Sequence, residues 1–280
     1  MTKIKIFKFL TIFITFLWLS IFALMPSILI LITSFLTYED TNFIKFTFTL
    51  NNYAEIFNTT YATIYYNSIR TALITTVTTL LLGYPFAYII AHINNKFTKT
   101  LLLILTIIPL WTSSLIRTYA IIVIFKFNGL LNKLLLFLGI INHPLNLLYN
   151  NFAIIFGLIY TLIPFMIFPL YIALEKIDNE YIEAAFDLGA SKLNIFFRII
   201  LPMSYNGIIS GCTFVFISSL GMFYIADILG GAKNTMLGNI IKDQFLIARN
   251  WPLGSVVCIT LLIFMGLCML LINRRTKTIT

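Results

Sequence analysis

Long apolar runs without a single charged residue recur along the whole chain. The runs Phe9–Tyr38, Thr71–Ala91 and Phe152–Leu174 contain no Asp, Glu, Lys or Arg. A helix needs about 20 apolar residues to cross the hydrocarbon core of a bilayer, where its backbone polar groups must be satisfied internally. The runs therefore predict several membrane-spanning helices, and they leave little of the chain for any other kind of fold.

Composition excludes a soluble domain. Hydrophobic residues make up 60% of the 280 residues and charged residues only 10%, whereas soluble domains carry about 25% charged residues. The net charge of +9 comes from basic residues at the ends of apolar runs, which is typical of topology signals and gives no indication of a nucleic-acid partner. The three cysteines lie inside apolar runs without the spacing of a metal site or a disulfide.

We expect an all-α polytopic protein with six transmembrane helices. The first run is too long for the apolar core of a signal peptide, which has about 7–15 residues. It is therefore read as an uncleaved span over residues 11–35. The third span is expected to be kinked at Pro109, and the run Leu134–Ile141 is too short to cross, so residues 126–150 are read as an external hairpin or interfacial helix. The other expected spans cover residues 70–91, 100–125, 152–174, 205–226 and 252–272.

Basic residues orient these spans. Lys3, Lys5 and Lys8 precede the first span, Lys96 and Lys99 form a short turn after the second, and the chain ends with Arg274, Arg275 and Lys277. Because basic residues collect on the cytoplasmic side, residues 1–10 and 274–280 are expected in the cytoplasm. A core of five helices is expected over residues 67–273, with residues 175–202 as its main cytoplasmic loop.

This loop, the most polar part of the chain, predicts two short helices joined at a glycine corner. Asp178 can cap the first helix, and Glu183 and Asp187 share a face of it. Gly189 can end it in a left-handed conformation, as glycine commonly does. Ser191 can cap a second helix over residues 192–200, which Pro202 is expected to stop. From these features alone the pair could equally be an amphipathic helix pair in the headgroup region, with Lys192 and Arg198 facing phosphates.

The spacing of Glu183-Ala184-Ala185, Gly189, Ile199 and Leu201-Pro202 resembles the EAA loop of permease subunits in bacterial binding-protein-dependent ABC importers. In that family the loop contains the coupling helix that seats in a groove of the ATPase subunit. The resemblance implies the MetI-like type I permease fold, and a location in the bacterial inner membrane. It also implies the coupling role for a set of residues here: Glu183, Ala184, Ala185, Asp187, Gly189, Ile199, Leu201 and Pro202.

The resemblance extends over nearly the whole chain and becomes more specific. Several motifs are similar to the B-type permease of spermidine/putrescine importers, which implies a polyamine cargo. These motifs are Thr49–Tyr53, Gly83–Ala87, Trp111–Arg117, Leu162–Met166, Leu174–Asp178, Phe223–Asp227, Gly230–Asn234, Gly238-Asn239, Gln244-Phe245 and Trp251-Pro252.

The chain contains no Gly-x-x-x-x-Gly-Lys-Ser/Thr phosphate loop. The subunit is therefore expected not to be an enzyme and to bind no cofactor, with ATP and Mg used by a partner. The resemblance implies that the partners are a second permease, two copies of an ATPase subunit and a periplasmic polyamine-binding protein. The expected mechanism is alternating access driven mechanically through the loop.

A path for a polycation should offer carboxylates and aromatic faces, since a cation–π contact contributes about 0.5–2 kcal/mol. Asp227 and Tyr224, at the end of the fifth span, are the first candidates, followed by Trp111 and Tyr119. Asp227 could instead cap the span while the aromatics form an interfacial belt. Arg117, within the third span, either snorkels outward or lines a cavity.

One alternative keeps the importer class and changes the cargo, and two belong to other classes. The importer could carry another small cation or an amino-acid derivative. An ion-coupled secondary transporter usually needs intramembrane carboxylates and an internal repeat, and apart from Asp227 at a boundary the spans contain neither. An enzyme within the membrane is disfavoured because His92 and His143 have no evident catalytic partner.

Overall fold

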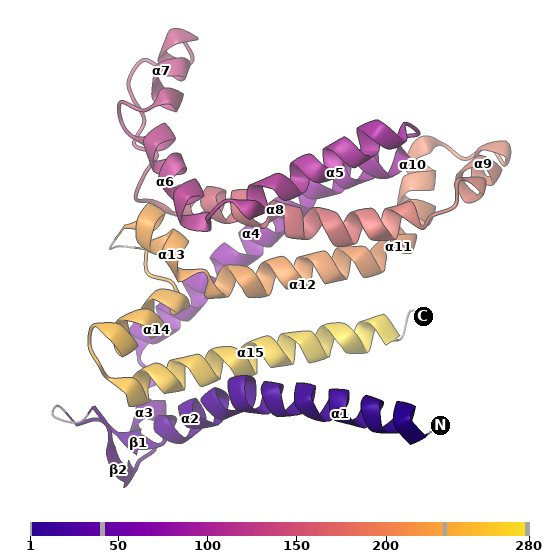
Figure 1. Cartoon of the computed structure of the whole chain (residues 1–280). Coiled ribbons are helices and arrows are strands. Elements are labelled where there is room, and N and C mark those ends of the chain that lie inside the picture. Colours follow the sequence, from indigo (N-terminus) through magenta and orange to yellow (C-terminus); the bar gives the residue numbers. More distant parts are fainter. Residues whose placement is uncertain (1, 40–42, 232–233, 278–280) are drawn as a thin grey trace. The chain divides into compact units, whose positions relative to one another are not determined.

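A computed structural model describes residues 2–39, 43–231 and 234–277, so the end of the expected cytoplasmic segment 274–280 lies outside the described residues. The described chain is mostly helical (Figure 1). It divides into two compact units, one made of residues 1–63 and 240–266, the other of residues 64–239 and 267–280.

The first unit begins with one long apolar helix and a short hairpin. Residues Lys8–Ser34 are apolar enough to cross a membrane, and the large side chains along this helix are exposed, as expected for a lipid-facing span. The Ser34 hydroxyl lies 2.8 Å from the Tyr53 hydroxyl, which ties the end of the span to the segment that follows. The elements are α1 (Thr2–Leu19), the π-helical turn η1 (Ser20–Leu24), α2 (Met25–Ser34), the antiparallel strands β1 (Leu36–Thr37) and β2 (Lys45–Phe48), and α3 (Asn51–Ile56).

The second unit holds the buried core, which centres on two closely packed helices. Helix α8 (Asn151–Glu175) packs along α12 (Tyr205–Gly221). At Gly207 a Cβ atom would lie 2.6 Å from the Ala173 Cβ and from the Pro169 carbonyl oxygen, so this position accepts no side chain. Small residues that let backbones approach are the usual solution for helix packing within a membrane. The other long elements of this unit are α4 (Thr59–His92), α5 (Lys96–Trp111), α6 (Ser114–Phe125) and α7 (Leu130–Phe137). Most of α14 (Leu237–Leu246) and of α15 (Trp251–Lys277) belongs to the first unit.

Among the described residues five helices are long and apolar enough to cross a membrane, and a bent pair raises the number to six. The five are Lys8–Ser34, Thr59–His92, Ser114–Phe137, Asn151–Glu175 and Trp251–Ile272. The bent pair consists of Lys192–Met203 and Tyr205–Gly221, which meet at 64°. If the bent pair is counted as one span, the six transmembrane helices expected from the sequence are confirmed.

The expected third span, residues 100–125, is wrong as a single kinked helix. Pro109 stays inside α5, and the chain breaks after it, where Thr112 is extended. The Thr112 hydroxyl donates to the Pro109 carbonyl at 2.8 Å, and such local bonds compete with helix continuation. Helix α6 then begins at Ser114, and part of the expected external hairpin joins it, since the candidate span Ser114–Phe137 includes α7.

Candidate functional site

Residues 178–204, here called the elbow, connect α8 to α12 within the second unit. The elbow contains α9 (Asn179–Asp187), α10 (Lys192–Ile195), the π-helical turn η2 (Phe196–Ile200) and α11 (Leu201–Met203). Helix α9 projects past the end of α8 (Figure 1). The two helices and the glycine corner expected from the sequence are present.

The corner has the geometry that the sequence predicted. Gly189 has φ of +78°, its N–H donates to the Phe186 carbonyl at 2.9 Å, and the Ala190 N–H donates to the Ala185 carbonyl at 3.0 Å. These two bonds form the Schellman motif, which closes a helix with a left-handed residue. The Ser191 hydroxyl accepts from the Asn194 N–H at 3.4 Å, as a cap of the next helix. Asp178 occupies the cap position of α9, but its side chain makes no capping hydrogen bond.

Helix α9 has a buried edge and an exposed face. Ala185 is only 8% exposed and belongs to the core of this chain together with Ile195 and Ile200. Its methyl group therefore packs inside this chain. Ala184, with Glu183 and Asp187, is exposed.

The exposed surface of the elbow combines carboxylates with large apolar side chains. Tyr181 is 56% exposed and Leu188 is 88% exposed. Helix α9 carries Glu180, Glu183 and Asp187 and no Lys or Arg. A helix that lies on a membrane surface is usually rich in Lys and Arg, because the lipid headgroups are often anionic. The acidic and apolar character of α9 favours a protein partner over the headgroup region.

The C-terminal end of the elbow packs partly against the core. Ile199 and Leu201 are half-buried, whereas Pro202 is exposed. Pro202 does not stop the helix as expected, since it sits in the first turn of α11, where a missing N–H costs nothing. The bend lies at Ser204 instead, whose hydroxyl is hydrogen-bonded to the Leu201 carbonyl at 3.1 Å.

Tyr84 of α4 joins the bend to the rest of the unit, and sequence reasoning missed it. Its hydroxyl lies 2.9 Å from the Ser204 hydroxyl, and its ring packs edge-on against Phe196 with centroids 5.7 Å apart. The two residues are 120 positions apart, so no local pattern could reveal the pair.

An ion pair fixes the start of the elbow. The Lys99 ammonium of α5 lies 2.8 Å from the Glu175 carboxylate at the end of α8, and 5.4 Å from the ring centroid of Tyr171. The hydrogen bond to Glu175 raises the pKa of the Lys99 amino group. Helix α5 is thus tied to the residue from which the elbow departs.

Of the described residues expected to line the transport path, Asp227 and Tyr224 lie close together. Asp227 and Tyr224 lie one helical turn apart in a short irregular segment, α13 (Phe223–Ile225) followed by the π-helical turn η3 (Ala226–Gly230). The side-chain amide of Asn239 donates to the Asp227 carboxylate and, at 3.1 Å, to the Phe223 carbonyl. Its oxygen accepts from the Met236 N–H at 3.1 Å. Asn239 was given no role from the sequence, and here it organises the segment.

The remaining candidates are not assembled around Asp227. Trp111 is 83% exposed and Tyr119 is 58% exposed, and in the described part of the chain neither reaches Asp227 through a hydrogen bond or ring contact. Arg117 is half-buried on the inner face of α6, with Thr118 and Ile121. Its Nε and Nη1 are buried without a hydrogen-bond partner among the described residues.

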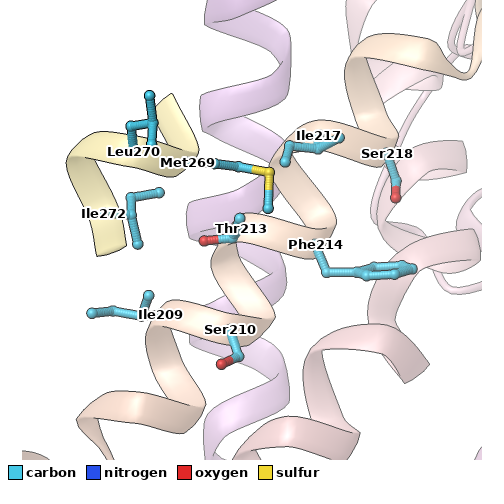
Figure 2. A pocket seen from close by; sticks show the side chains of 9 residues that line it. All are labelled: Ile209, Ser210, Thr213, Phe214, Ile217, Ser218, Met269, Leu270 and Ile272. Carbon is cyan, nitrogen blue, oxygen red and sulfur yellow. The ribbon is translucent and has the colours of Figure 1, made fainter. Parts of the chain in front are cut away.

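A groove of about 670 Å³ runs between α12 and the last turns of α15 (Figure 2). Ser210, Thr213 and Ser218 of α12 are its polar groups, and the Thr213 hydroxyl is buried without a hydrogen-bond partner among the described residues. The rest of the lining is apolar, and neither the elbow helix α9 nor Asp227 reaches it. No group of three metal-ligating side chains occurs in the described residues.

These features define a membrane permease with an acidic, exposed elbow between two core helices. The chain belongs to the family of inner membrane components of binding-protein-dependent transport systems, whose model matches residues 83–276. It is a multi-pass membrane protein with the MetI-like fold of ABC importer permeases.

Two curated relatives are similar over almost their whole length. The chain is 47% identical over 271 residues to the spermidine/putrescine transport system permease protein PotB of Haemophilus influenzae, covering 97% of this chain and 94% of the relative. It is 46% identical over 260 residues to PotB of Escherichia coli, covering 93% of this chain and 94% of the relative. A subunit of a bacterial alginate ABC transporter, solved with an alginate-bound periplasmic protein, shares the fold with a TM-score of 0.82 at 16% identity, covering 99% of this chain and 96% of that chain.

Proposed function

We propose that this chain is the permease of a polyamine importer, through which spermidine or putrescine crosses the bacterial inner membrane by alternating access. The 46–47% identity to PotB proteins over most of the chain is the observation that supports a polyamine as the cargo. Hydrolysis of ATP with Mg is assigned to a separate ATPase subunit, because this chain has no phosphate loop.

The elbow is the proposed point of contact with the ATPase. Three properties support the assignment: the exposed carboxylates of α9, the exposed Tyr181 and Leu188, and the closed corner at Gly189. Interfaces between proteins are enriched in such aromatic and apolar anchors surrounded by polar groups. Because Ile195 and Ile200 of the elbow are buried in the core of the unit, a force on α9 would be transmitted to α12 through a packed connection.

The proposed assembly contains a second permease of similar fold, two ATPase subunits and a periplasmic polyamine-binding protein. Its orientation places both termini and the elbow in the cytoplasm. The basic residues that flank the spans support this orientation, since Lys and Arg accumulate on the cytoplasmic side of inner membrane proteins. ATP-driven closure of the two ATPase subunits would then rock the membrane helices of both permeases.

Asp227 is the proposed carboxylate of the path, with Tyr224 beside it, and a charge substitution separates this role from a structural one. Asp227→Asn keeps an oxygen that can accept from Asn239 but removes the negative charge. If Asp227 contacts the cargo, the KM for spermidine rises about tenfold, because a hydrogen bond to a charged group is lost. An unchanged KM in uptake assays, with unchanged protein yield, would assign Asp227 to the architecture of the segment alone.

Uptake into proteoliposomes tests the function as a whole. The complex of this permease with its partner permease, ATPase and binding protein is reconstituted and given radiolabelled spermidine, with and without ATP enclosed on the ATPase side. ATP-dependent uptake that unlabelled putrescine reduces is the expected result. Uptake by this chain alone, driven by an ion gradient, would contradict the importer assignment. ATP-dependent uptake of an amino-acid derivative in place of either polyamine would retain the importer and reject the cargo.

A further inference from the structure

A small polar cavity lies between α4 and α8, away from the elbow and from Asp227. Its volume is about 70 Å³. Asn67, Arg70 and Thr71 of α4 line one side and Asn151 of α8 lines the other, with Ile74 and Ile155 as apolar walls. The cavity contains one cation, two amides and a hydroxyl, and no carboxylate.

The polar side chains that line this cavity form no hydrogen bond or ion pair with one another or with other described residues. Thr71 is only 8% exposed, yet its hydroxyl makes no hydrogen bond within the described part of the chain. Arg70 forms no ion pair with any described carboxylate. Asn67, Arg70 and Asn151 are exposed, and Thr71 is nearly buried beside them, so the donors of these four side chains are available to a ligand with acceptor oxygens.

The first turn of α8 adds to the positive potential. Asn150 caps this 25-residue helix by accepting from the Ala153 N–H at 2.9 Å, and Asn151 is its first residue. The N-terminus of a helix carries roughly half a positive charge and donates free N–H groups to anions. A guanidinium, amide donors and a helix N-terminus together select an anion.

The depth of the cavity is that of lipid headgroups. Arg70 directly precedes the uncharged run of α4, and Asn151 directly precedes the uncharged run of α8. The two helices run in the same direction, because farther along them Gly83 approaches Met166 and Ile167. Both helices therefore enter the apolar region at this level, where phosphate groups of the bilayer lie.

A second, apolar groove continues from the cavity. It has a volume of about 340 Å³ and is lined by Tyr66, Ile69, Arg70, Leu73 and Ile74. Arg70 and Ile74 belong to both spaces. Leu73 is 51% exposed and Tyr66 is 65% exposed, so the groove opens outward with an aromatic at its rim. A polar anion site joined to an apolar groove matches an amphiphile and not a free ion.

We propose that these two joined spaces form a phospholipid-binding site. The phosphodiester oxygens accept from Arg70, Thr71 and the first turn of α8, and an acyl chain lies in the groove along Leu73 and Ile74. The occupant is a membrane lipid because a carboxylate from a soluble protein would not require the apolar groove. The bound lipid pins α4 against α8 at their common end.

Native mass spectrometry of the full-length chain in detergent tests the site, with dioleoyl-phosphatidylglycerol as the probe. Arg70→Gln is expected to lower the affinity for the most tightly bound phosphatidylglycerol molecule about tenfold, because a charge-assisted hydrogen bond to its phosphate is lost. Thr71→Val keeps the shape of the side chain and removes only the hydroxyl, so a smaller loss is expected. Arg198→Gln, on the exposed surface of the elbow, is the matched control and should retain lipid as the unmodified chain does.

The outcomes separate the lipid site from its alternatives. Equal retention by the Arg70→Gln variant and the unmodified chain would overturn the proposal. An equal loss in Arg70→Gln and Arg198→Gln would also overturn it, because it would reflect general attraction between charges. Unchanged lipid retention with weakened capture of the external binding protein would assign Arg70 to a carboxylate of that protein instead. Failure of both Arg70→Gln and Thr71→Val to lower retention would reject the site even if one variant were poorly folded.

Discussion

The elbow and the segment around Asn239 lie before and after the same helix, α12, and they are held together in different ways. The elbow, residues 178–204, closes its corner with hydrogen bonds between residues a few positions apart, Ala185 to Ala190 and Phe186 to Gly189. The Asn239 segment, residues 222–231 and 234–239, depends on one buried side chain that reaches back to Phe223 and Asp227. The bonds of the elbow join backbone groups at its corner, so the side chains of α9 remain exposed to a partner. The bonds of Asn239 instead occupy the Phe223 carbonyl and the Asp227 carboxylate within their own segment.

This difference bears on function. Most of α9 is exposed, and its carboxylates Glu183 and Asp187 remain available to a partner. Asp227 is also exposed, but its carboxylate already accepts a hydrogen bond from Asn239. The elbow has the character of an interface, and the Asn239 segment has the character of a brace that could also contact cargo. Variants that damage one region and spare the other test this division.

A variant that disrupts the packing of α12 should disturb both the elbow and the Asn239 segment, because this helix lies between them in the chain. Gly207→Val places a side chain against the Pro169 carbonyl oxygen and Ala173, and overpacking of this kind costs about 3 kcal/mol. Thermal unfolding of the purified chain should therefore shift strongly downward. Gly266→Ala is the control, since a Cβ there meets nothing within 4 Å and the midpoint should stay unchanged or rise. A stable Gly207→Val chain would contradict the close packing of α8 and α12.

Asn239→Leu should loosen the Asn239 segment and spare the elbow. Asn239 is 3% exposed, and its loss leaves the Met236 N–H and Phe223 carbonyl without their partner, at a cost of about 2 kcal/mol. Limited proteolysis should then cleave near residue 231, while capture of the ATPase subunit stays normal. Loss of ATPase capture together with cleavage would show that the two regions do not respond independently.

Tyr84→Phe should weaken only the attachment of the elbow to α4. The variant removes the hydroxyl that pairs with Ser204 and retains the ring against Phe196, so a loss of about 1 kcal/mol is expected. Hydrogen exchange should rise at residues 200–205 and stay constant in the Asn239 segment. Unchanged exchange at the bend would show that the ring contact alone holds it.

The sequence predicted what depends on neighbouring residues and missed what depends on distant ones. The apolar runs predicted five of the spans correctly. The positions of Gly189 and Ser191 predicted the corner of the elbow and the N-cap of its second helix. The ends of the third span were wrong because a local hydrogen bond of Thr112, and not the proline before it, breaks the helix. The pairing of Tyr84 with Ser204 and the role of Asn239 join residues whose proximity exists only after folding.

The central claim is that the elbow, held in shape at Gly189, receives the ATPase subunit. Gly189→Val and Gly189→Asn test it directly, because a Cβ at this position meets no atom of this chain within 4 Å, so the two variants differ within this chain mainly in the backbone conformation that they tolerate. Asn tolerates the left-handed conformation, whereas Val is a genuine outlier there, and the left-handed state costs roughly 1–2 kcal/mol. The measurement is the amount of ATPase subunit that co-purifies with each variant. Capture should fall about tenfold for Gly189→Val and stay near normal for Gly189→Asn, with equal membrane insertion. Full capture and full uptake with Gly189→Val would contradict the docking role of the elbow.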